Sequence, residues 1–229
     1  MEFRTITRGA AILALGLAAA GCTSTSGGGG AGGGGGGAGP ASKADFQKEF
    51  DRVTGVAPTS DMPKTLKAKY TGAAQMDLKE ASTQSTVGGV LADLDLNVDW
   101  TEGQSGNPWS GSAKNFRGTF KGQDFTADGE LTVANAEAKG LPSVVGRNES
   151  TINAPVVGPI TTATGSAKIE LAGDLESGND TGTILMSLGG NMFGKEGAGI
   201  AGTAQGLWFD KSSGFGDVAA GGTFYLDKN

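Results

Sequence analysis

The chain has few residues that could do chemistry: among its 229 residues there is one cysteine, Cys22, and no histidine. Without histidine there is no Ser-His-Asp or Cys-His nucleophile, no histidine general acid–base catalysis, and no histidine ligand for a metal or haem. A single cysteine also excludes an intrachain disulfide and a thiolate zinc site. Cys22 is therefore the reactive side chain whose surroundings in the sequence matter most.

Cys22 directly follows a stretch with the pattern of a secretory leader. Residues 1–21 begin with a basic region, Arg4 and Arg8, and continue with an apolar run that is shorter than the roughly 20 residues a membrane span needs. The run ends in Ala19-Ala20-Gly21-Cys22, which resembles a bacterial lipobox with alanine where leucine is preferred. This pattern predicts cleavage between Gly21 and Cys22 and lipidation of the Cys22 sulfur. The alternative is ordinary signal cleavage beside an incidental cysteine.

Lipidation of Cys22 would hold the chain at a membrane, because several acyl chains on one cysteine anchor stably where a single chain is marginal. Thr23 follows, and not the aspartate typical of inner-membrane retention, so the expected address is the outer membrane, reached through the lipoprotein sorting and surface-export machinery. Residues 22–40 then form a glycine-rich tether. A flexible chain of this length spans about 20–25 Å between its ends.

Residues 41–60 are expected to form one amphipathic helix and a linker. Ser42 can cap the start of the helix, and Gly55 can end it. Phe46, Phe50 and Val53 recur at helical spacing and form an apolar stripe. So short a helix is marginal alone, so its stripe must pack on the rest of the protein or bind a partner.

Residues 61–229 carry the period-two alternation of β-strands. The clearest run is 89–101, where apolar residues alternate with mostly aspartate and asparagine. Similar runs cover 66–78, 116–133, 167–171 and 182–226, the last including Phe215. Regular strands separated by Gly, Asn and Asp turns predict an all-β fold, an antiparallel, soluble β-barrel of about eight strands. Residues 141–159 contain prolines and no clear period, so we expect a long loop there, with room for a short strand at most.

Three further patterns were weighed as sites and favour structural roles. Residues 197–202 match G-x-G-x-x-G, but a dinucleotide site needs a helix to follow, and a strand is expected there. Asp93, Asp95 and Asp99 alternate along one strand, which indicates a solvated face rather than a calcium loop. The remaining conceivable haem-iron ligands and the tryptophans are expected in the core or at its rim: Tyr70, Met76, Met186, Met192, Tyr225, Trp100, Trp109 and Trp208. No metal site, cofactor or catalytic residue is therefore predicted.

Several short motifs resemble, in order and spacing, the β-barrel lobe of transferrin-binding-protein-like surface lipoproteins. They are Met62-Pro63, Tyr70-Thr71-Gly72, Val98-Asp99-Trp100, Trp109-Ser110-Gly111, Asn115-Phe116, Phe193-Gly194, Ile200-Ala201-Gly202 and Gly222-Thr223-Phe224. The resemblance covers about residues 60–229, with Leu66 and Lys195 departing from the family pattern. It implies an eight-stranded barrel displayed on the outer membrane, since relatives bind transferrin and other host iron proteins, haemoglobin or haem, or complement regulators. Their binding loops share no motif, so no ligand-binding residue can be carried over.

Together these features predict a lipid-anchored, cell-surface binding module that is not an enzyme, with a protein or haem-type ligand held on the barrel loops. The net charge of −6 and the lack of a Lys/Arg cluster argue against nucleic acid as a partner. Three alternatives remain: a small transmembrane barrel, a periplasmic structural lipoprotein, and a hydrolase that uses an Asp/Glu pair, for which no spacing speaks.

Overall fold

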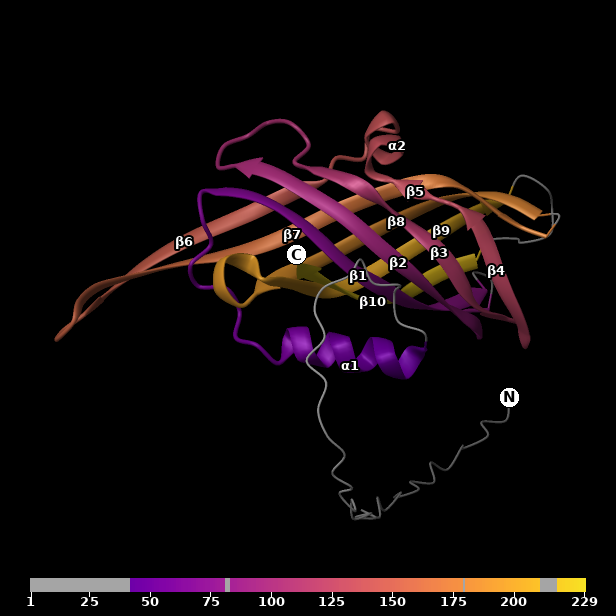
Figure 1. The fold of residues 1–229 in the computed structure, drawn as a ribbon, viewed down its shortest axis with the longest axis horizontal. Coiled ribbons are helices and arrows are strands. Elements are labelled where there is room, and N and C mark those ends of the chain that lie inside the picture. The colour runs from indigo at the N-terminus through magenta and orange to yellow at the C-terminus, as the bar shows by residue number, and fades with distance from the viewer. Residues whose placement is uncertain (1–41, 81–82, 179, 211–217) are drawn as a thin grey trace, which may run out of the picture. The chain divides into compact units, whose positions relative to one another are not determined.

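The structure is a computed structural model that describes residues 42–80, 83–178, 180–210 and 218–229, and it is mostly antiparallel β-sheet (Figure 1). The helical elements are α1 (Lys43–Thr54), α2 (Val133–Ala138) and the short 3-10 helix η1 (Lys195–Gly197). The strands are β1 (Thr65–Glu80), β2 (Thr86–Thr101), β3 (Trp109–Phe120), β4 (Gln123–Gly129), β5 (Leu131–Thr132), β6 (Val144–Ala154), β7 (Gly158–Ser177), β8 (Asp180–Phe193), β9 (Gly199–Asp210) and β10 (Val218–Lys228). Cys22, the predicted tether and Phe215 lie outside the described residues.

The strands close into a ring. Neighbours run in the order β2-β1-β10-β9-β8-β7, after which β4 and β5 both bridge β7 to β3, and β3 returns to β2. Because β4 and β5 share one position, the ring has about eight strands, which confirms the predicted antiparallel barrel. β6 stands off this ring and pairs with β7.

The alternation predicted for residues 89–101 places its apolar residues in the barrel interior. The members of this set are all buried: Val90, Ala92, Leu94, Leu96, Val98 and Trp100. The facing strands add Tyr70, Ile169, Leu188 and Phe224 to the same core cluster. Burial of each large apolar side chain contributes about 1.5–3 kcal/mol, so side-chain packing in the lumen is the main source of the barrel's stability.

Helix α1 packs on the outside of the barrel wall. Phe46 and Val53 are buried against outward-facing residues of β1, β2, β9 and β10, and the ring centroids of Phe46 and Tyr225 lie 5.4 Å apart. The Ser42 hydroxyl accepts a hydrogen bond from the Asp45 N–H at 3.2 Å, which confirms the predicted cap. The predicted stripe is therefore covered by the barrel itself.

The two ends of α1 mark the two ends of the barrel. Near its start, Lys43 pairs with Asp77 at 3.7 Å, close to the turn between β1 and β2. Near its finish, Arg52 pairs with Asp227 on the last residues of β10. We call the first of these the turn end. In the described part of the chain, no helix is long and apolar enough to cross a membrane.

Two expectations were wrong. Residues 141–159 are not a long loop, because 144–154 form β6 and pair with β7 along their whole length. The run 116–133 does not stay extended to its end either: Thr132 accepts a hydrogen bond from the Asn135 N–H at 3.1 Å and caps α2, which the sequence reading missed. In α2, Val133 and Ala136 are buried, so the apolar residues there still face the core.

Candidate functional site

The feature that distinguishes this barrel is a hairpin that projects from it, formed by β6 and the first half of β7 (Figure 1). Their register runs from Val144 opposite Lys168 to Ala154 opposite Gly158. β7 joins β8 only from Ser166 onward. Residues 147–165, which we call the arm, therefore extend past the ring of strands at the end opposite to the turn end.

Local chemistry explains why this segment forms a hairpin. The strands are rich in β-branched residues, and Thr151 and Thr161 face each other with their hydroxyl oxygens 2.8 Å apart. Pro155, Val156 and Val157 form the loop between the paired residues Ala154 and Gly158. Gly158 takes a φ of +84°, which glycine tolerates without strain and which lets the chain reverse direction.

The tip of the arm is apolar and uncharged. Val156 is 97% exposed and Val157 is 77% exposed, and Ile152 and Ile160, which are paired across the two strands, are 61% and 42% exposed. From Ser150 to Ala167 the sequence contains no charged residue. Scattered apolar side chains on a surface are ordinary, but a concentrated group on a projecting element marks an interaction surface.

The outer edge of β6 is a second feature of the arm. Within the described residues β6 pairs only with β7. An edge strand presents N–H and C=O groups that another extended chain can bind, and proteins usually protect such edges with charges or by covering them. Beyond Glu149 the arm carries neither a lysine nor an acidic residue to do so.

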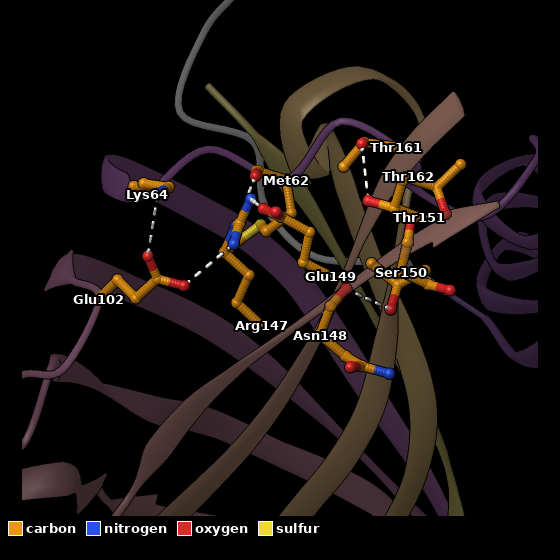
Figure 2. A network of polar contacts seen from close by, with 11 residues as sticks. Met62, Lys64, Glu102, Arg147, Asn148, Glu149, Ser150, Thr151, Thr161 and Thr162 are labelled. Atoms are coloured by element: carbon orange, nitrogen blue, oxygen red, sulfur yellow. Dashed lines mark hydrogen bonds and ion pairs between the residues drawn. The ribbon is translucent and has the colours of Figure 1, made fainter. Parts of the chain in front are cut away.

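The base of the arm is held by Arg147 (Figure 2). Its Nε donates to the Met62 carbonyl at 3.0 Å, and its two terminal nitrogens donate to Glu102 at 2.9 Å and to Glu149 at 2.5 Å. Met62 belongs to the segment that leads into β1, and Glu102 follows β2. Although it carries a charge, the Arg147 side chain is only 9% exposed. One guanidinium thus ties three segments together where the arm leaves the barrel.

Electrostatics at this base favour the ionised groups. The hydrogen bond from Arg147 holds the pKa of Glu149 below its ordinary value, and Lys64 adds a weaker attraction in the same direction. The two carboxylates in turn raise the pKa of Arg147, chiefly through the hydrogen bond that Arg147 donates to Glu149. Lys64 also lies 3.7 Å from Glu102, so the cluster alternates in charge.

The other side of the arm is fastened by backbone hydrogen bonds. The Met62 N–H donates to the Ala163 carbonyl at 2.9 Å, and the Ala163 N–H donates to the Ser60 carbonyl at 2.9 Å. Beside this contact lies an open groove of about 390 Å³, lined by polar groups of Asn148, Thr164 and Asn191 and by Arg147. The arm therefore has a fixed base and a free tip.

The residues weighed as sites in the sequence are not brought together into one. Asp93, Asp95 and Asp99 lie on the outside of β2, and each pairs with a cation, namely Arg117, Lys69 and Lys67 at 3.0, 3.0 and 2.7 Å. The G-x-G-x-x-G run continues into strand β9 rather than a helix. Among the described residues, no group of three or more His, Cys, Asp and Glu side chains could hold a metal ion.

The conceivable haem ligands are likewise spread over the fold. Met76 and Met186 point into the barrel at the turn end, whereas Met192 lies near Gly197 at the other end. Tyr70 is buried in the interior, but Tyr225 lies on the outer wall beneath α1. Met76 and Met186 line the same apolar cavity, and the other side chains of this set lie apart from it.

The sequence did not predict the arm, because the arm carries no residue type typical of a catalytic or metal site and no clear period-two alternation. The available signal was the uncharged run from Ser150 to Ala167, with its threonines and two prolines. Comparisons of this chain with protein families, curated proteins and solved structures found no match.

Proposed function

We propose that this protein is an outer-membrane lipoprotein, anchored through acylated Cys22, that acts at the cell surface as a non-enzymatic module and binds a protein partner through the arm. The observation that carries the proposal is the arm, a hairpin that projects from a closed barrel, carries no charge beyond Glu149, has an apolar tip and is braced at its base. The resemblance to transferrin-binding-protein-like lipoproteins is consistent with this role.

The chemistry of the arm indicates how a partner would be recognised. An extended segment of the partner can add a strand to the edge of β6, where main-chain hydrogen bonds supply affinity. The tip residues Ile152, Val156 and Val157 would then enter apolar pockets of the partner. Haem by itself fits the arm less well than a protein partner does, because the arm has no side chain that commonly ligates iron.

The place where α1 begins on the barrel supports an arm that points away from the membrane. α1 begins at the turn end of the barrel, and the arm leaves the opposite end. The proposed tether over residues 22–40, with an average span of about 20–25 Å, would therefore hold the turn end nearer to the lipid. The arm would then point away from the membrane that carries the anchor.

The outer wall argues against the alternative of a transmembrane barrel. Lys67, Lys69 and Arg117 all lie on the outside of the ring in ion pairs. On a lipid-facing wall, each lysine or arginine near the bilayer midplane costs about 2–4 kcal/mol. A barrel surrounded by water carries the same groups at little cost.

Two measurements test the anchor and the address. Cells grown with labelled palmitate should incorporate the label into the wild-type protein and not into Cys22→Ser. Protease added to intact cells should digest the wild-type protein while a periplasmic marker survives. If the protein survives as the marker does, it is a periplasmic structural lipoprotein and surface display is wrong.

The role of the arm is tested by charge placed at its tip. Val156→Asp should weaken binding to a captured host protein, such as transferrin or a complement regulator, by about 10- to 100-fold, because burial of one valine contributes about 1.5–3 kcal/mol. The matched control is Val56→Asp, since Val56 is also an exposed valine but lies outside the arm. Equal binding by both variants would show that the arm is not the contact surface.

A further inference from the structure

We propose that the barrel interior at the turn end is a binding site for the end of a single unbranched hydrocarbon chain. This region holds a cavity of about 70 Å³ between β1, β3, β4, β8, β9 and β10. Met76 and Met186 are fully buried on its floor. Among the described residues, Phe120, Phe125 and Trp208 are only partly buried and line the side of the cavity nearest the end of the barrel. The site is separate from the arm, and the proposal does not depend on the arm's function.

The lining selects an apolar ligand. Of the side chains around the cavity, Ser177 carries the one hydroxyl and none carries a charge. A cavity with such walls holds water poorly, because water there would lack hydrogen-bond partners, and such cavities accept apolar guests instead. Among the described residues no charged side chain lines the cavity, and the Ser177 hydroxyl already donates to the Thr126 carbonyl at 2.9 Å.

The size of the cavity then selects the shape of the ligand. A cavity that takes benzene measures about 150 Å³, and sites for drug-sized ligands measure about 300–1,000 Å³. The cavity of about 70 Å³ is too small for a ring or a macrocycle, but it can take the last few carbons of a chain. Methionine side chains are unbranched and adapt easily, so Met76 and Met186 can move aside to lengthen the space.

The methionines provide the assay, because the described residues place two of them at the cavity and the other two, Met62 and Met192, near the opposite end. The full chain with Cys22→Ser, labelled with ¹³C at the methionine methyl groups, is titrated with 1-alkanols from butanol to decanol without detergent. We expect saturable shifts of the Met76 and Met186 methyl signals, with Met62 and Met192 unchanged. Affinity should rise about fourfold per added methylene and then level off.

Two neighbouring residues of β10 give a matched pair of variants. Ala220 lines the cavity, whereas Ala219 faces outward and pairs with Leu207. Ala220→Leu should fill the cavity and abolish the shifts without lowering the melting temperature, and Ala219→Leu should bind as the wild type does. If Ala220→Leu does not fold, Ala127→Leu, from β4 on the same cavity, replaces it.

The source of the chain is distinguished by three probes of equal chain length: hexanol, hexanoate, and dihexanoylphosphatidylcholine below its micelle concentration. If hexanol and hexanoate bind and the phospholipid does not, the source of the chain is a free fatty acid. If the phospholipid binds, the source is a membrane lipid. The proposal is overturned if no saturable shift occurs, if all four methionines shift equally, or if cyclohexanol binds as tightly as 1-hexanol.

Discussion

The Tyr70 hydroxyl links the connection between β8 and β9 to the barrel interior. Tyr70 is completely buried, and its hydroxyl donates to the Gly197 carbonyl at 2.6 Å. Gly197 ends η1 and takes a φ of +71°. Burial raises the pKa of Tyr70 far above its ordinary value, so the hydroxyl keeps its proton and remains a donor at neutral pH. The Tyr70 ring also packs against Trp109, with centroids 6.0 Å apart.

The substitution Tyr70→Phe removes the hydroxyl and keeps the ring. The packing against Trp109 is retained, so the loss is that of the hydrogen bond together with the Gly197 carbonyl left without its partner. A buried polar group deprived of its partner costs about 1–3 kcal/mol. For a domain of this size, 1 kcal/mol corresponds to about 2–4 °C. We therefore expect the free energy of unfolding to fall by about 2 kcal/mol and the melting temperature by about 4–8 °C.

The measurement is urea unfolding followed by tryptophan fluorescence, with thermal unfolding as a second readout. Tyr225→Phe is the matched control, because its ring packs on Phe46 and its hydroxyl makes no hydrogen bond to another described residue. The control should change the free energy of unfolding by no more than about 0.5 kcal/mol. If the two variants are equally stable, the Tyr70 hydroxyl does not hold this connection.

Three further predictions concern the wall, the helix and the base of the arm. A side chain at Gly72 would put its Cβ 2.0 Å from the Tyr225 carbonyl oxygen, so Gly72→Ala should lose about 3 kcal/mol in urea unfolding, whereas Gly221→Ala, with open space around it, should lose none. Phe46→Ala should cost about 3–5 kcal/mol and expose α1 to limited proteolysis, unlike Gln47→Ala on its exposed face. The Glu149 carboxyl should titrate below 4.5 in an NMR experiment and return toward that value in Arg147→Met. Because this folded-state pKa is lowered, the brace is complete above about pH 4.5 and is lost as the pH falls through the lowered value.

The barrel could be predicted from the sequence because its lumen imposes a strict order on the chain. Every second residue of β2 must face the interior, and a shift by one position would bury Asp95 and Asn97 in place of Leu94 and Leu96. The helix could be predicted for a similar reason, because its three apolar residues must all lie on the face that packs against the barrel. Where one side of an element is buried, the pattern of residue types follows from the packing.

The arm could not be predicted in this way, because neither of its faces is buried. Ile152 and Ile160 are directly paired, yet both are exposed, so no core selects which positions are apolar. Its prolines also mislead, since Pro155 lies in the loop and Pro159 at the start of β7, where each is tolerated. α2 was missed for a different reason. The Thr132 hydroxyl accepts a hydrogen bond from the Asn135 N–H, and this local bond starts a helix at the point where the alternating pattern would continue the strand.

The docking of α1 connects the proposed anchor to the proposed binding surface. With α1 packed on the wall, the first residue of the helix lies at the turn end, and the arm lies at the other end. If Phe46→Ala releases the helix, the predicted free chain grows from about 18 residues (23–40) to about 34 (23–56), and its average span rises by about 1.4-fold, because the span grows as the square root of length. The attachment point then moves to Ala57, whose carbonyl accepts a hydrogen bond from the Gly194 N–H, on the arm's own side of the barrel. A partner that approaches from outside the cell should therefore bind Phe46→Ala more weakly on intact cells than in solution, whereas a variant of the tip should lose binding in both settings.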